Sequence, residues 1–76
     1  MLEIDKKCLS YVEEWLGIEN ISIKNDKFVA EVKLPYDNGL VSKIMSYGNG
    51  IKVLSPEKLY NDIKNFANDI INEYKD

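Results

Sequence analysis

Residues 41–74 read VSKIMSYGNGIKVLSPEKLYNDIKNFANDIINEY, and this stretch decides the fold. Its first part, 41–47, predicts an apolar helical segment. Gly48 ends that helix, because glycine readily adopts the left-handed conformation of a helix end. The pair Asn49-Gly50 predicts a turn, and residues 51–54 predict a short strand. The order is therefore helix, turn and strand, followed by one long last helix.

The last helix has clear start signals. Ser55 is a good N-cap, Pro56 suits the first helical position, and Glu57 is favourable in the positive first turn. An apolar stripe with helical spacing follows. It consists of Leu59, Ile63, Phe66, Ala67, Ile70 and Tyr74, widened by Tyr60 and Ile71. The helix contains four asparagines, which are poor helix formers, so we expect packing rather than intrinsic propensity to stabilise it.

The length of this helix predicts an overhang. From residue 56 to 74 it spans about 28 Å at 1.5 Å per residue, whereas a strand of five or six residues spans about 17–20 Å. We expect Leu59 and Ile63 to anchor the helix on its own domain. The predicted interaction residues are those of the overhang: Phe66, Ile70, Ile71 and Tyr74. An alternative stays open, in which the stripe only closes the domain's own core.

The first half of the chain predicts a strand, a helix and a hairpin. Leu2 and Ile4 alternate with a glutamate, as in a short strand. Asp5 is placed to cap the helix that follows. On that helix Cys8, Val12 and Trp15 share one apolar stripe, and we expect Trp15 to be largely buried. Gly17 ends the helix, with Ile18 folding back on its last turn.

Two alternating segments, 21–24 and 28–34, flank the pair Asn25-Asp26, a typical two-residue hairpin turn. Pairing Lys24 with Lys27 places Ile23 opposite Phe28 and Ile21 opposite Ala30. All four then lie on one side of the sheet, as a buried face requires.

The predicted order is β-α-β-β-α-β with an extra helix at the end, with Asp37 or Asn38 capping the second helix. This fold class is α+β, a ferredoxin-like βαββαβ sandwich with an additional C-terminal helix. The 76 residues predict a single domain. The first strand, which is central in such a sheet, begins at residue 1 or 2. This favours Met1 as an added start residue and the chain as one module of a longer protein.

The composition narrows the possible functions. The net charge is −3 and all ten basic residues are lysines, which argues against a strong nucleic-acid binder. Without arginine, bidentate contacts to phosphate or guanine are not available. A single cysteine fits a reducing cytosol. No apolar run reaches the roughly 18 residues of a membrane span, and no signal peptide opens the chain.

The order and spacing of residues 44–59 resemble the C-terminal WCX domain of bacterial WYL-domain transcriptional regulators. In that family a helix ends in a hydrophobic-x-Ser-aromatic-Gly pattern, leads into a Val-x-Val-Leu-x-Pro-Glu-x-Leu strand, and is followed by a closing helix. The matching residues are Ile44, Ser46, Tyr47, Gly48, Val53, Leu54, Pro56, Glu57, Leu59 and Tyr74. The chain departs from the pattern at Ser55, where an acidic residue is common, and in its lack of arginine.

The resemblance implies a cytoplasmic bacterial regulator with three parts. An N-terminal winged helix-turn-helix would bind DNA, a central WYL domain would be the neighbouring domain, and this module would support homodimerisation and effector sensing. It would not be an enzyme, and no cofactor is expected. The alternative is a small-molecule-binding regulatory domain of ferredoxin-like fold, because fold alone does not choose between the two.

Residues that could carry chemistry are few. Histidine is absent, which removes the usual general base and the commonest metal ligand. Cys8 has no histidine to activate it, and a place in the core is the simpler interpretation. Asp62, Asp69 and Glu73 share one side of the last helix and are interpreted as a solvated face. We therefore expect no catalytic residue and no metal site.

Four lysines predict a weak nucleic-acid face at most. They are Lys24, Lys27, Lys33 and Lys52. By strand parity these lysines share the outer face of the sheet with Ser22, Val29, Glu31 and Leu54. RNA-binding sheets of this topology stack bases on aromatic side chains. Here Phe28 points inward by the same parity, so a solvated or partner-covered face is favoured over a nucleic-acid site.

Overall fold

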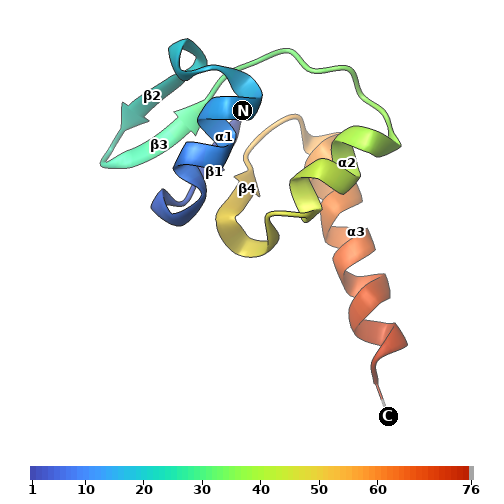
Figure 1. The fold of residues 1–76 in the computed structure, drawn as a ribbon. Helices are drawn as coiled ribbons and strands as arrows, with labels where there is room; N and C mark the ends of the chain where they lie inside the picture. Colours follow the sequence, from blue (N-terminus) through green and yellow to red (C-terminus); the bar gives the residue numbers. More distant parts are fainter. Residues whose placement is uncertain (76) are drawn as a thin grey trace.

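The computed structural model describes residues 1–75, which form a mixed α+β fold with a four-stranded antiparallel sheet and three α-helices (Figure 1). The elements, in chain order, are β1 (Leu2–Ile4), α1 (Leu9–Leu16), β2 (Ile21–Lys24), β3 (Lys27–Ala30), α2 (Asn38–Met45), β4 (Ile51–Val53) and α3 (Glu57–Glu73). Short 3-10 turns lie at Lys6–Cys8, Ile18–Asn20 and Gly48–Gly50.

The sheet has the strand order β2-β3-β1-β4, with β1 central and antiparallel to both β3 and β4. Leu2 pairs with Ala30 on one side and with Val53 on the other. These side chains lie on one face, which we call the inner face. Buried residues of α1 and α2, including Val12 and Ile44, pack with them in a single core. The two helices therefore cover the inner face.

The hairpin register is confirmed. Lys24 pairs with Lys27, Ile23 with Phe28 and Ile21 with Ala30. Asn25 and Asp26 both have positive φ, 52° and 65°, as the primed turns of two-residue hairpins require. The expected burial of Ile23 is wrong, because 68% of its surface is exposed. It lies at the turn end of edge strand β2, with β3 on one side and no strand on the other.

Two predicted helix starts are also confirmed. An Asp5 carboxylate oxygen accepts a hydrogen bond from the Lys7 amide (3.0 Å), opening the 3-10 turn that leads into α1. Asp37 Oδ1 accepts from the Leu40 amide (2.8 Å) and caps α2. Gly17, with φ of 88°, ends α1, but Ile18 is 67% exposed and does not fold back on the helix as expected.

The start of α3 differs from the prediction. The helix begins at Glu57, so Pro56 is in the N-cap position rather than the first helical one, and no side chain caps the helix. Ser55 instead accepts hydrogen bonds from the Met1 nitrogen, through its carbonyl oxygen at 2.8 Å and through Oγ at 3.3 Å. A tertiary contact with the start of β1 therefore replaces the local cap.

The predicted strand 28–34 is too long. β3 ends at Ala30, which pairs with the first residue of β2. The Glu31 amide still donates to the Asn20 carbonyl (3.3 Å), after which the chain leaves the sheet for α2. Val32 and Leu34 are half-buried against the core, so the alternation reflects packing of a connecting segment rather than strand pairing.

Trp15 is half-buried, which corrects the expectation of deep burial. Its ring stacks on Tyr47 with a centroid distance of 6.0 Å, and Lys43 Nζ lies over both rings, at 5.6 and 5.4 Å from their centroids. Val12, one turn earlier on α1, is the residue of this helix with no exposed surface, and Cys8 is buried as expected. The apolar stripe of α1 therefore buries its middle and leaves Trp15 at the rim.

Candidate interaction surfaces

The end of α3 projects from the domain. Figure 1 shows the helix running away from the sheet, and the longest dimension of the molecule is 43 Å against 24 and 22 Å for the others. Leu59, in the first turn of α3, is 5% exposed, and Ile63 is half-buried against the core. The first two turns thus anchor the helix on α2 and β4, and the last turns extend beyond them.

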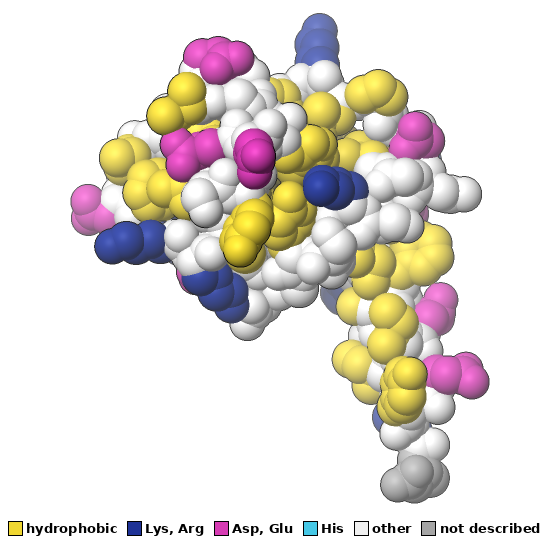
Figure 2. Space-filling view, in the orientation of Figure 1, with side chains coloured by type: hydrophobic (Ala, Val, Ile, Leu, Met, Phe, Trp, Pro, Cys, Tyr) yellow, Lys and Arg dark blue, Asp and Glu magenta, His cyan; other side chains and the backbone are white. Residues whose placement is uncertain are grey.

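The overhang exposes the four side chains named from the sequence. Phe66 is 46% exposed, Ile70 52%, Ile71 57% and Tyr74 83%. Figure 2 shows hydrophobic side chains gathered along the projecting helix. Isolated apolar side chains on a surface are ordinary, whereas a contiguous group indicates an interaction site.

A groove lies beside the anchored half of α3, between this helix and the edge strand β4. Its volume is about 340 Å³, and it is lined by Asn49, Ile51, Lys52, Val53, Tyr60, Ile63 and Lys64. Its charged lining residues are two lysines. Sequence reasoning did not find this groove, because it depends on how β4 and α3 pack against each other. The groove and the overhang thus lie along the same helix, one beside each half of it.

The outer face of the sheet carries three of the four predicted lysines, Lys24, Lys27 and Lys52, all exposed. Lys33 is also exposed, but it lies beyond the end of β3, so its predicted place on the sheet is wrong. Two of the sheet lysines are paired with glutamates. Lys24 Nζ lies 2.9 Å from Glu31 and Lys27 Nζ lies 3.5 Å from Glu3. The hydrogen bond from Lys24, together with its positive charge, lowers the pKa of the Glu31 carboxyl from its ordinary value. Much of the positive charge on this face is thus compensated within the sheet.

Val29 corrects the description of the outer face as solvated. It points outward by strand parity, between Ser22 and Glu3, yet it is 5% exposed. The two lysine–glutamate pairs lie around it, and lysine side chains often cover apolar surface with their aliphatic stems in this way. The outer face therefore contains a small covered apolar patch rather than a row of free cations.

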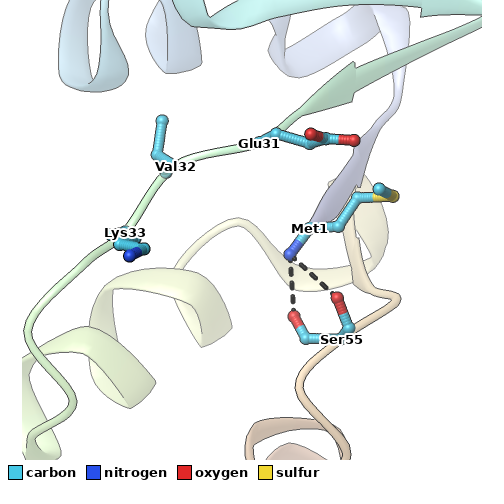
Figure 3. Close-up of a pocket in the computed structure, with 5 residues that line it drawn as sticks. All are labelled: Met1, Glu31, Val32, Lys33 and Ser55. Carbon is cyan, nitrogen blue, oxygen red and sulfur yellow. Dashed lines mark hydrogen bonds between the residues drawn. The ribbon is translucent and has the colours of Figure 1, made fainter.

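A second groove, of about 410 Å³, lies where the ends of β1, β3 and β4 meet, and Figure 3 shows its lining. Its lining residues are Met1, Glu31, Val32, Lys33 and Ser55. The Glu31 carboxylate, the Lys33 ammonium and the terminal ammonium of Met1 put one negative and two positive charges beside it. The groove is open to solvent. Two of its lining residues, Met1 and Ser55, are joined by the hydrogen bonds already described.

The residues considered for catalysis do not converge. Cys8 is a buried free thiol, and a side chain at Gly50 would clash with its sulfur, so the two segments are closely packed. Within residues 1–75 there is no cluster of three or more cysteine and carboxylate side chains that could hold a metal ion. Asp62 faces Lys58 at 3.6 Å, one turn away on α3. Among the helices of residues 1–75, none is both long and apolar enough to cross a membrane.

The fold and its surfaces define a small α+β module whose main distinguishing feature is an exposed apolar helix end. A family model described as the WCX domain matches residues 1–70. This match covers most of the chain, and the protein therefore belongs to the WCX domain family. Comparison with curated proteins and with solved structures returns no significant match.

Proposed function

We propose that this WCX domain is the non-catalytic C-terminal module of a cytoplasmic, WYL-type bacterial transcription regulator, in which it supports dimerisation and effector sensing. Family membership supports the link to regulators. The observation that carries the interaction role is the exposed apolar end of α3, where four large side chains are between 46% and 83% exposed. Its natural partners are a second copy and the neighbouring WYL domain, with DNA bound through the regulator's N-terminal domain.

We also propose that the fold is the ferredoxin-like sandwich with one added C-terminal helix. The element order β-α-β-β-α-β and the antiparallel strand order β2-β3-β1-β4 support this assignment. In this description the first six elements build the sandwich and α3 is the addition. The helix that exposes the interaction surface is then the part by which this module differs from the basic fold.

The first experiment measures the solution mass of the 76-residue chain by light scattering over a range of concentrations. We expect a dimer with twice the 8.8 kDa chain mass at high concentration, dissociating on dilution. A monomer at every concentration would remove the dimerisation role. Effector sensing is tested separately with short single-stranded oligonucleotides. Their affinity for the neighbouring domain of the regulator is measured with and without the WCX domain.

The alternative function is a small-molecule-binding regulatory domain, and the open groove beside Met1, Lys33 and Glu31 favours it. A ligand with one anionic group and an apolar part would match the two positive groups, Lys33 and the Met1 amino group, and Val32 in that groove. A thermal-shift screen of charged metabolites tests this function. A hit whose stabilisation disappears in Lys33→Glu, but not in Lys64→Glu on the other groove, would support it over the interaction role.

A further inference from the structure

We propose that two copies of this chain pair through antiparallel α3 helices, with the two-fold axis beside Ala67 and the overhang of each copy lying in the β4–α3 groove of the other. This inference rests on the proposed dimerisation role and specifies its geometry. The proposed interface combines the overhang with the β4–α3 groove, which the sequence did not reveal.

The apolar stripe of α3 has a symmetry that suits this pairing. Tyr60, Ile63, Ala67, Ile70 and Tyr74 follow one another at spacings of three, four, three and four residues, which is the spacing of a helix–helix seam. In an antiparallel pair centred on Ala67, each position before Ala67 faces the position equally far after it in the other copy. Tyr60 therefore faces Tyr74, Ile63 faces Ile71 and Ala67 faces its own copy. The smallest side chain lies at the crossing, where the two helices approach most closely.

The groove explains why the pair should be antiparallel rather than parallel. Tyr60 and Ile63 belong both to the stripe and to the groove lining, and Ile51 and Val53 of β4 form its other wall. In an antiparallel pair, the partner's last turns run beside this anchored half and cover the groove. In a parallel pair the two overhangs would contact only each other, and both grooves would stay open.

Charge gives an independent reason. The groove carries Lys52 and Lys64, whereas the charged residues of α3 beyond Lys64 are Asp69 and Glu73. The first half of α3 is neutral, because Glu57 and Asp62 balance Lys58 and Lys64. Antiparallel pairing places the acidic end of one helix beside this neutral half and the groove of the other, and sets the two helix dipoles in opposite directions. Parallel pairing would place the two acidic ends together and align the two dipoles. Charge and the groove thus favour the same arrangement.

The available area is sufficient for a specific but modest dimer. Five side chains of the surface, Tyr60, Phe66, Ile70, Ile71 and Tyr74, are between 43% and 83% exposed. At about 200 Å² for each fully exposed large side chain, their exposed parts come to roughly 500 Å² per copy. Complete coverage of these parts in two copies buries about 1,000 Å², the minimum for a specific interface. Ile51 and Val53 of β4 add little to this area, because they are only 6% and 4% exposed.

Cysteine cross-linking tests the geometry. In a Cys8→Ala background, which removes the native thiol, single cysteines replace Ala67 on the seam or Asn68 on the neighbouring face. We expect Ala67→Cys to form a disulfide with its own copy about tenfold faster than Asn68→Cys, because pairing raises the effective thiol concentration towards the millimolar range. Equal rates in a chain that light scattering shows to be dimeric would overturn this arrangement and leave dimerisation standing.

The direction of the helices is tested with cysteines at the two ends of the stripe. An antiparallel pair predicts rapid cross-linking when Tyr60→Cys and Tyr74→Cys chains are mixed, and slow cross-linking of each alone. Rapid self-linking of Tyr74→Cys would indicate a parallel pair and overturn the proposal. Circular dichroism verifies that each variant is folded, and Tyr60→Ser and Tyr74→Ser report any loss of dimer caused by removing the ring. A monomeric parent chain would defeat both this inference and the dimerisation role.

Discussion

Individual residues of the outer sheet face hold one another in place, and the Lys24–Glu31 pair is the clearest case. The two side chains are 2.9 Å apart and both are more than half exposed. An exposed pair of this kind contributes little to stability, and salt screens it. The pair instead shapes the surface. It engages a lysine that would otherwise be free to bind an anion, and its side chains lie around the buried Val29.

The Glu31 pair predicts a small pH dependence of stability. The pKa of Glu31 is lowered in the folded chain, so the unfolded chain binds more protons in acid. The stabilisation is therefore present above the unfolded value of about 4.5 and is lost as the pH falls through the lower folded value. Urea unfolding of the wild type and Glu31→Gln between pH 7 and pH 3 should show a difference that shrinks at the acidic end and in high salt. A constant difference across this range would contradict the assignment.

Trp15 provides a second prediction at the residue scale. A deeply buried tryptophan typically costs about 3–5 kcal/mol on truncation to alanine. Because Trp15 is half-buried, we expect Trp15→Ala to cost about 2 kcal/mol, through loss of the Tyr47 stack and of the Lys43 contact. Chemical denaturation measures this value. Lys43→Met should shift the tryptophan emission of the folded chain, and an unchanged spectrum would show that the cation does not contact the ring.

At the scale of single elements, the hairpin and the last helix show what sequence can and cannot predict. The β2–β3 register follows from local alternation and from a turn type that Asn25-Asp26 specify, so it was predictable residue by residue. The start of α3 was not, because Ser55 bonds to Met1, more than fifty residues away in the chain. The exposed end of α3 was predicted from its length alone. The β4–α3 groove depends on how two elements pack and has no local signal.

Shortening a side chain to alanine should change the free energy of unfolding differently in the two halves of α3. Ile63→Ala removes a side chain packed on the core and should lower the free energy of unfolding by about 1–3 kcal/mol. Ile70→Ala removes a side chain that projects from the domain, and should change it by less than about 0.5 kcal/mol in dilute solution. Denaturation at low protein concentration makes the comparison. Equal costs at the two positions would show that the overhang packs within its own domain.

On the scale of the whole molecule, charge argues against strong nucleic-acid binding by this domain alone. The chain is acidic, and two of its three sheet lysines are engaged with glutamates. We expect weak binding of a single-stranded oligonucleotide that fades steeply as salt rises, and that weakens further in Lys33→Glu and Lys52→Glu. Fluorescence anisotropy at two salt concentrations measures it. Submicromolar affinity at physiological salt would contradict this account of the outer face.

The central claim is that the exposed end of α3 is a contact surface for a second copy, and one measurement tests it most directly. Sedimentation equilibrium compares the wild type with Ile70→Asp and Ile71→Asp, and with Asn72→Asp as a control that adds the same charge on the opposite side of the helix. We predict a dimeric wild type and control, and two monomeric isoleucine variants that keep the wild-type circular dichroism spectrum. A monomeric wild type, with both isoleucine variants unfolded, would show that the stripe belongs to the domain's own core and would contradict the claim.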